Sequence, residues 1–450
     1  MKRSLTSMTE GSPARLLISF ALPLIFANVF QQLYTVTDTA IVGQGVGLHA
    51  LAAVGAADWF HWMLLSTVQG ICAGFAVRFS QQFGARDESG LRRTIASAAV
   101  LSVLLTLVLT AASQLLVYPV LHLLDTPPEI IGGAATYLRV MFLGLPLTML
   151  ANFTASLLRS LGDSRTPLYG TIFASLLNVV LDLLFVFPFR WGIAGAAFAS
   201  VIAQGASALV NLVRLRGLSI VRLQRSDFDG WQKLVFPLLR LGVPIASMNA
   251  ITAVGGMGVQ SVVNRFGATV IAGFTATNKL YGLLEIASMS YGYAISTYTG
   301  QNFGAGDFGR IRRGVRAAVC LSLGTATVLG LLIYWNRAAL TGLFISSTDP
   351  AEAAAALAIS TRYLALMCSW LSALYLIFVY RSALQGMGQV IVPMLSGALE
   401  TVIRIGSVFL LVSFWSDAIY YAEVFAWAGA ALFNAAGYYV LVHRWKHNQT

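Results

Sequence analysis

Long apolar stretches, separated by short charged gaps, run along the whole of this sequence. About 20 consecutive apolar residues are enough to cross a lipid bilayer as a helix. The pattern therefore predicts an all-α, polytopic membrane protein with twelve transmembrane helices. We expect these helices at residues 14–42, 50–79, 94–118, 130–156, 167–189, 193–216, 238–263, 269–298, 314–338, 355–382, 391–414 and 419–444.

The composition argues against a soluble protein. Charged residues make up 10% of the chain and apolar residues 57%, whereas a soluble protein carries about 25% charged residues. The net charge is +11, but the basic residues lie in the gaps between apolar stretches. A nucleic-acid-binding protein would gather them on one soluble face. We therefore expect anionic membrane lipids, and no nucleic acid, as partners.

The basic residues are distributed unevenly between successive gaps. The gaps on one side of the membrane hold 22 lysines and arginines, among them Arg381, and those on the other side hold three, Arg190, Arg265 and Arg337. Positively charged loops remain in the cytoplasm. The pattern predicts that both termini are cytoplasmic, and it agrees with an even number of crossings.

The sequence contains an internal repeat. Residues 81–87 (QQFGARD) recur as residues 301–307 (QNFGAGD), 220 positions later, and the Gly162…Pro167 pair recurs 226 positions later as Gly388…Pro393. We interpret residues 1–213 and 238–450 as two six-helix lobes, joined by a cytoplasmic linker at 214–237. Both halves begin on the same side, so the repeats are parallel. Such repeats typically enclose a central cavity that opens alternately to each side, although gene duplication alone would also leave a repeat.

Polar residues share one face of the first predicted helix. Gln31, Tyr34, Thr35 and Asp38 follow the spacing i, i+3, i+4, i+7, which places them on one side. A face this polar is not expected to contact lipid. We infer that it lines a cavity or another helix, and that Gln31, Tyr34 and Thr35 are candidates for contact with substrate.

The fifth predicted helix carries a second carboxylate. Asn178 and Asp182 are spaced i, i+4, and no lysine or arginine lies inside this helix or inside the first, where Arg15 stands at the cytoplasmic end. An ionisable group inside the membrane costs a few kcal/mol unless it is paired, hydrated or functional. Asp38 and Asp182 are therefore candidates for binding a proton or Na⁺. The alternative is that each carboxylate hydrogen-bonds a neighbouring helix.

The second half carries different polar groups. Glu400 and Arg404 are spaced i, i+4 with the acid first, the favourable order for an intrahelical ion pair. This pair is either structural or functional. Asn278, Tyr281 and Glu285 follow the spacing i, i+3, i+7 and form a second candidate wall of a substrate cavity.

Motifs for other chemistries are absent from the sequence. It contains no GxxxxGK[ST] motif for ATP and no HExxH motif, its five histidines do not cluster, and its three cysteines are far apart. We expect no metal, no cofactor and no enzymatic activity.

Several stretches resemble the multidrug and toxic compound extrusion (MATE) family of secondary transporters. They are residues 20–24 (FALPL), 30–43 (FQQLYTVTDTAIVG), 50–55 (ALAAVG), 178–182 (NVVLD), 383–388 (ALQGMG) and the two FGA loops.

The resemblance implies a bacterial inner-membrane protein with twelve helices in two lobes and a central V-shaped cavity. It also implies export of lipophilic, often cationic compounds in exchange for H⁺ or Na⁺. The cation site of similar members maps onto Asp38, Asn178, Asp182 and Ser200, and Pro23 matches a proline that permits the first helix to bend. Another branch uses acids in its seventh and tenth helices, which this sequence lacks.

Other functions remain open from the sequence. One alternative is a flippase of a lipid-linked precursor, although its cavity would need several buried cations, and only Lys279 and Arg404 lie deep inside predicted helices. Another is an exporter of one specific metabolite. A remote alternative is an integral-membrane transferase. In each transport hypothesis the partner is a small-molecule substrate, and we expect a monomer.

Overall fold

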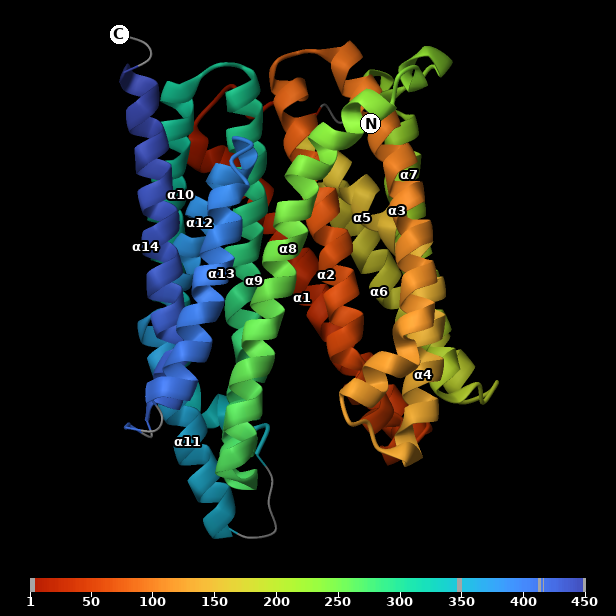
Figure 1. Cartoon of the computed structure of the whole chain (residues 1–450), viewed down its shortest axis with the longest axis vertical. Helices are drawn as coiled ribbons and strands as arrows, with labels where there is room; N and C mark the ends of the chain where they lie inside the picture. The colour runs from red at the N-terminus through yellow and green to blue at the C-terminus, as the bar shows by residue number, and fades with distance from the viewer. Residues whose placement is uncertain (1–4, 346–349, 412–413, 416, 448–450) are drawn as a thin grey trace. The chain divides into compact units, whose positions relative to one another are not determined.

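The computed structural model describes residues 5–345, 350–411, 414–415 and 417–447 (Figure 1). These residues are helical or lie in short connections, and no strand occurs among them. The all-α prediction is therefore confirmed. Lys2 and Arg3, two of the basic residues assigned to the cytoplasmic side, lie outside the described residues.

Seven helices and two short 3₁₀ turns make up the first half of the chain. They are α1 (Pro13–Gly45), α2 (Leu48–Gly84), α3 (Glu88–Leu123), α4 (Pro128–Leu143), α5 (Leu145–Ser160), α6 (Arg165–Val186), α7 (Gly192–Arg216), η1 (Ser219–Val221) and η2 (Arg225–Phe228).

The second half has the same kind of succession. It contains α8 (Gln232–Val263), the turn η3 (Asn264–Phe266), α9 (Ala268–Gly304), α10 (Phe308–Gly342), α11 (Pro350–Ser369), α12 (Leu371–Gly386), α13 (Ile391–Gly406), the π-helical turn η4 (Ser407–Leu411) and α14 (Ala418–His447).

Each predicted transmembrane segment contains helix, but two of them are broken. The segment at 130–156 consists of α4 and α5, whose axes differ by 49° across Gly144. Pro146 lies at the start of α5 and cannot continue the hydrogen bonding of α4. The segment at 355–382 consists of α11 and α12, separated at Trp370.

The described chain contains ten helices long and apolar enough to span a membrane, or eleven if the bent pair α4–α5 counts as one span. The segment predicted at 269–298 is helical as part of α9, but it is not among these eleven. Its many serine, threonine and tyrosine residues make it more polar than the others.

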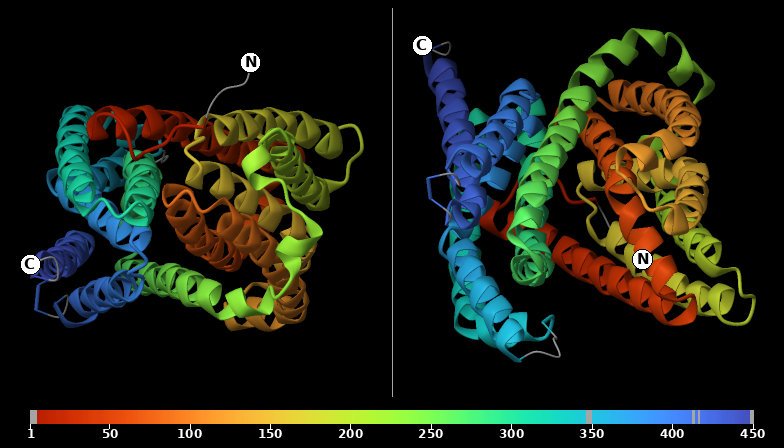
Figure 2. Two further views of the ribbon diagram at one scale, coloured as in Figure 1. Left: turned by 90° about the horizontal axis from the view of Figure 1, so that it is seen from above. Right: turned by 60° about the horizontal axis from the view of Figure 1, so that its bottom comes forward.

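The chain packs into two compact units. Unit 1 contains the residues up to Met8 and Leu22–Ala246, and unit 2 contains Thr9–Ala21 and the chain from Ser247 onward. Helix α1 therefore contributes to both units, although it runs as one uninterrupted helix (Figure 2). The lobes expected at 1–213 and 238–450 stay a prediction, since packing units need not coincide with the halves of a sequence repeat.

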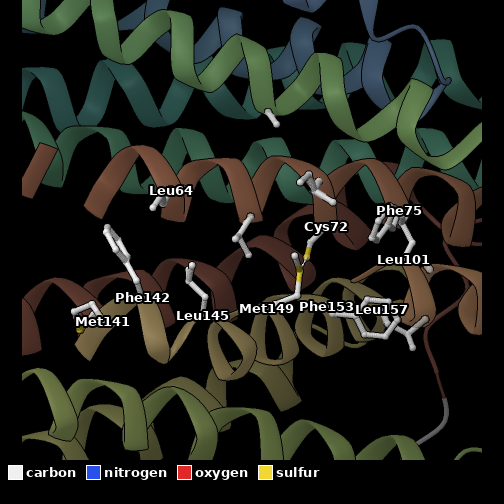
Figure 3. Close-up of a cluster of buried hydrophobic side chains, with 14 of the residues drawn as sticks. Leu64, Cys72, Phe75, Leu101, Met141, Phe142, Leu145, Met149, Phe153 and Leu157 are labelled. Atoms are coloured by element: carbon white, nitrogen blue, oxygen red, sulfur yellow. Dashed lines mark hydrogen bonds between the residues drawn. The ribbon is translucent and has the colours of Figure 1, made fainter. Parts of the chain in front are cut away.

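An apolar core fills unit 1 (Figure 3). Phe142 packs edge-on against Phe60 with ring centroids 5.0 Å apart, and the thiol of Cys72 contacts the sulfur of Met149 at 3.6 Å. Two residues from the region around the expected linker, Val221 and Leu238, are buried in the same core.

Polar contacts also hold this linker. Asp227 lies 3.6 Å from Arg92 of α3 and accepts a hydrogen bond from the backbone N–H of Gln224. The linker is thus part of the packed body of unit 1.

The internal repeat recurs in the backbone. Asp87 and Asp307 cap α3 and α10 in the same way, each accepting a hydrogen bond from the backbone N–H three residues ahead. Gly162 and Gly388 both adopt positive φ, at 86° and 80°. Because only glycine adopts such angles readily, these turns explain why the glycines recur at the same spacing.

One position of the repeated turn differs between the halves. Gly306 has φ 74°, and the residue 220 positions before it, Arg86, has φ 57°. An L-residue in this left-handed region costs roughly 1–2 kcal/mol. The first half therefore carries a strained residue where the second half has glycine.

We predict that Gly306→Ala lowers the stability of the protein by about 1 kcal/mol. An added Cβ would meet no atom within 4 Å, so the left-handed backbone supplies the whole cost. Thermal unfolding of the purified protein in detergent measures the change. Gly324→Ala is the matched control, because Gly324 lies inside α10 with equally open space and alanine favours helix. A Gly306→Ala protein as stable as the control would contradict this account.

Candidate functional site

Helix α1 brings the first candidate residues into unit 1. It continues for 33 residues through Pro23, whose missing N–H removes one hydrogen bond of the helix. The division between the two packing units falls next to this proline, between Ala21 and Leu22. The role of Pro23 as a bending point stays a prediction.

The carboxyl groups of Asp38 in α1 and Asp182 in α6 lie within hydrogen-bonding reach of each other. Asp182 is fully buried and Asp38 is half-buried. One oxygen of each carboxyl group, Oδ1, is buried without a hydrogen-bond partner. Among the described residues, no lysine, arginine or histidine forms an ion pair with either aspartate.

Asn178 and Ser200 complete one side of this carboxylate pair. Asn178 is fully buried between Asp182 and Ser200. With its NH₂ group directed at the carboxylate, the amide donates to Oδ2 of Asp182 at 2.8 Å and accepts from the backbone N–H of Ser200 at 3.3 Å. This orientation satisfies both ends of the amide. The structure thus brings together all four residues of the predicted cation site.

Two tyrosines add hydroxyl groups to the pair. The hydroxyl of Tyr34 lies within hydrogen-bonding reach of Ser200 and close to both aspartates. Tyr137 of α4 is buried and also lies close to both aspartates. Carboxylate, amide and hydroxyl oxygens from four helices therefore converge inside unit 1.

Sequence reasoning missed three residues near this site. Tyr137 lies in an apolar segment with no polar periodicity, so no pattern marks it. Asp58 and His61 are spaced at one helical turn near the start of α2, a position that suggests the membrane interface. In the structure, Asp58 lies within electrostatic range of Asp38, and the ring of His61 packs edge-on against Tyr137 with centroids 6.2 Å apart.

Two candidates on the same face of α1 do not join the aspartates. Gln31 and Thr35 are exposed, and the hydroxyl of Thr35 donates to the backbone oxygen of Gln31 at 3.0 Å within the helix. Both remain candidates for contact with substrate.

The arrangement of the aspartates determines what the site can bind. Two adjacent carboxylates cannot both stay charged in a buried site at low cost. A proton shared between them, or one Na⁺ held by their oxygens with those of Asn178 and Ser200, would cancel one of the two negative charges and relieve the repulsion between them. The arrangement thus offers carboxyl groups to a proton and oxygen ligands to a small cation.

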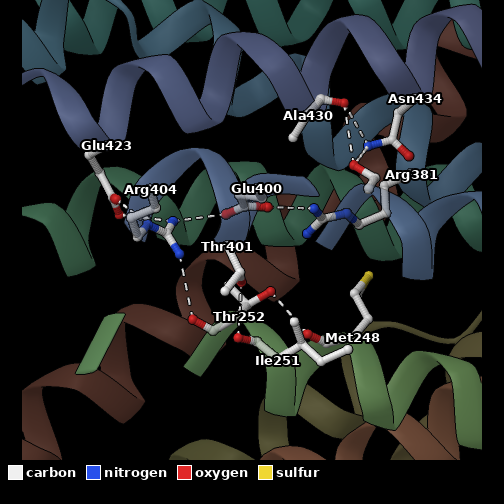
Figure 4. Close-up of polar contacts among 11 residues, drawn as sticks. Met248, Ile251, Thr252, Arg381, Glu400, Thr401, Arg404, Glu423, Ala430 and Asn434 are labelled. Carbon is white, nitrogen blue, oxygen red and sulfur yellow. Dashed lines mark hydrogen bonds and ion pairs between the residues drawn. The ribbon is translucent and has the colours of Figure 1, made fainter. Parts of the chain in front are cut away.

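Unit 2 contains a buried ion network (Figure 4). Arg404 donates to Oε1 of Glu400 at 2.9 Å and to both oxygens of Glu423, while Arg381 donates to Oε2 of Glu400 at 2.8 Å. The residues come from α12, α13 and α14. Arg381, assigned from the sequence to a cytoplasmic gap, is instead buried within α12, where its charge is paired with Glu400.

The second candidate wall lies beside this network. Tyr281 stacks on Trp427 with ring centroids 5.8 Å apart, and Glu285 lies within electrostatic range of Glu400 and Glu423. Asn278 is exposed on α9 and takes no part in the network.

The MatE family model matches residues 23–184 and 244–410 of the chain. The chain belongs to the MATE family of membrane transporters. The Bacillus subtilis "Probable multidrug resistance protein YpnP" is 30% identical over 94% of this chain and 90% of its own length. The Thermotoga maritima "Probable multidrug resistance protein NorM" is 27% identical over 74% and 72% of the two chains.

Solved MATE structures have the same fold. A crystal structure of MATE in complex with MaL6 gives a TM-score of 0.91 at 20% identity and covers 98% of both chains. An outward-facing MATE transporter also gives 0.91, at 19% identity, over 99% of this chain and all of its own. At these identities the likeness establishes the fold alone.

Family membership excludes one alternative left open by the sequence and confirms the predicted class of protein. MATE proteins are transporters, so the chain is not a membrane transferase or another enzyme. It is a multi-pass membrane protein, as the hydrophobic pattern predicts.

We predict that Asp182→Asn stabilises the protein, and that the gain grows with pH. The substitution removes one of two adjacent, unpaired acids, whose repulsion increases as both become ionised. We expect a gain of about 1 kcal/mol at alkaline pH and little change at acidic pH. Thermal unfolding of wild type and variant in detergent, at one acidic and one alkaline pH, measures the two changes in stability.

Asp163→Asn is the control with the opposite sign. Asp163 is ion-paired with Arg214 at 3.1 Å and accepts hydrogen bonds from the backbone of Arg165 and Thr166. Its removal should destabilise the protein at alkaline pH. Destabilisation by Asp182→Asn at alkaline pH would contradict this account, because it would show that another group already compensates the negative charge of the aspartate pair.

Proposed function

We propose that this MATE transporter is a secondary active exporter of lipophilic, often cationic compounds. Entry of H⁺ or Na⁺ drives the export by alternating access. The observation that carries the proposal is the adjacent, unpaired pair Asp38 and Asp182, with Asn178 and Ser200 beside it. The printed names of the B. subtilis and T. maritima relatives, both described as probable multidrug resistance proteins, support export of foreign compounds.

The coupling follows from the charge of the aspartate pair. A bound cation changes the balance between two conformations only if it binds one of them more tightly. The charged pair favours the conformation in which a cation or water reaches it, and the neutralised pair favours the one in which it is enclosed. Binding of a cation from outside, followed by its release inside, therefore drives the conformational cycle in one direction.

The orientation in the membrane is part of the same proposal. The excess of lysine and arginine in alternate gaps supports cytoplasmic termini, and the likeness to bacterial relatives supports the bacterial inner membrane. Anionic lipids are the partners that the basic gaps favour. We propose a monomer as the functional form.

A second candidate function is export of one metabolite. The Shewanella oneidensis "FAD transporter" is 26% identical over 75% of both chains, so a relative with a defined cargo exists. The flippase alternative has less support. The buried arginines Arg381 and Arg404 are both paired with glutamates, so neither is free to bind a phosphate.

We predict that Asp38→Asn reduces gradient-driven export by about tenfold or more, because coupling between two ligands is typically worth 1–3 kcal/mol. Proteoliposomes loaded with a fluorescent cationic dye, with an imposed pH or Na⁺ gradient, measure the export. The two gradients identify the coupling ion, and FAD in place of the dye tests the second candidate function.

Asp229→Asn is the matched control for this experiment. Asp229 is an exposed aspartate in the linker, so its substitution removes the same charge away from the site. The control should export at the wild-type rate. If Asp38→Asn exported the dye at the wild-type rate under both gradients, the proposed mechanism would be wrong.

A further inference from the structure

The buried ion network of unit 2 is balanced in charge. Arg381, Glu400, Arg404 and Glu423 alternate in sign, with two positive and two negative side chains. All four carboxylate oxygens of the two glutamates accept a hydrogen bond from a guanidinium. The network is therefore complete by itself and has no carboxylate left to take up another charge.

Glu285 adds one acid to this balanced network. It is half-buried in α9 and lies within electrostatic range of Glu400, Glu423 and Arg404. No lysine, arginine or histidine of the described residues forms an ion pair with it. Arg404, the cation that acts on it, is already held by two glutamates. An ionised Glu285 therefore leaves one excess negative charge inside the unit.

The groups around Glu285 supply no compensating charge. On α9 itself, the hydroxyl of Tyr281 lies within hydrogen-bonding reach, and Lys279 is exposed. Helix α11 contributes the neutral Tyr363, which lies within electrostatic range of Glu423 and Arg404, and its Arg362 is ion-paired with Asp417. The charged residues of α10 lie near its two ends, at 310–316 and Arg337, and Arg381 of α12 is satisfied by Glu400.

A metal ion does not fit this position. Within the described residues, no group of three or more His, Cys, Asp or Glu side chains is placed to hold one. The oxygens of Glu400 and Glu423 are all engaged by guanidinium groups, so Tyr281 is the oxygen donor left beside Glu285. A proton needs only the carboxyl group itself and relieves the same excess charge.

Two buried donors near the network lack partners. They are the indole N–H of Trp427, which is fully buried where its ring stacks on Tyr281, and Nε of Arg381. Unsatisfied buried donors are positions where water binds. They favour a hydrated region beside Glu285, through which a proton can reach the carboxyl group.

We propose that Glu285 takes up and releases a proton during transport, as a second proton-exchange group separate from Asp38 and Asp182. The inference rests on the proposed function, since it adds a proton site to the same transport cycle. When ionised, Glu285 competes with Glu400 and Glu423 for Arg404. When protonated, it leaves Arg404 to them, so its state is coupled to the helices that carry the network.

Infrared difference spectroscopy of the purified protein across a pH titration tests this directly. A protonated carboxyl group gives a C=O stretching band that disappears when it ionises. We expect a titrating band in the wild type that is lost in Glu285→Gln and retained in Asp38→Asn, whereas any band of the aspartate pair is retained in Glu285→Gln. Absence of a Glu285-dependent band, or a Glu285-dependent band that does not change with pH, would overturn the proposal.

Glu423→Gln separates this role from a structural one. It breaks an ion pair with Arg404 and should lower the melting temperature, whereas Glu285→Gln removes an unpaired acid and should leave it unchanged or raise it. Glu285→Asp should restore a titrating band. Destabilisation by Glu285→Gln equal to that by Glu423→Gln would count against the proposal.

Dye binding and the infrared titration together distinguish a role of Glu285 in cargo binding from a role in proton exchange. If Glu285 were instead the counter-ion of a cationic cargo, Glu285→Gln would weaken binding of the dye by about tenfold without changing the titrating bands, and the proposal would be wrong. The infrared result does not depend on coupled export. Failure of gradient-driven export in the wild type would therefore refute the proposed function without deciding the state of Glu285.

Discussion

A carboxylate inside a membrane-spanning unit has to be neutralised, and the structure depends on how each unit does this. The cost of an isolated buried charge is several kcal/mol. Unit 2 meets it with two arginines from its own helices, which pair with Glu400 and Glu423. Unit 1 offers no such partner to Asp38 and Asp182 among its described residues. The proposed uptake of H⁺ or Na⁺ would supply the neutralising charge there.

The repeat places different polar groups at corresponding positions of the two halves. At the spacing of 226 residues that relates Gly162 to Gly388, Asn178 corresponds to Arg404. The first half has an amide where the second has a guanidinium. The amide orients Asp182 without cancelling its charge, whereas the guanidinium ties two glutamates together. The acids differ as well, since at this spacing Glu400 corresponds to Ala174 and Asp182 corresponds to Val408.

The pattern of the sequence was sufficient for the class of fold and for much of the candidate site. Asp38 and Asp182 stand out because an acid in an apolar helix has few explanations, Asn178 follows from its spacing with Asp182, and the resemblance supplied Ser200. Tyr137, Glu423 and Arg381 could not be found in this way. Each acquires its partner from another helix, and periodicity along one helix carries no information about its neighbours. The break between α4 and α5 depends on Gly144 and Pro146, which an average over a long apolar stretch conceals.

The packed linker and the divided α1 have a consequence for any attempt to produce half of this transporter. Val221 and Leu238 belong to the core of the first unit, and Thr9–Ala21 belongs to the second. If the chain were divided at residue 213, the amino-terminal fragment would lack Val221 and Leu238 of its own core. The carboxy-terminal fragment would lack Thr9–Ala21, which packs in unit 2. A working fragment therefore has to be designed from the packing units rather than from the symmetry of the sequence.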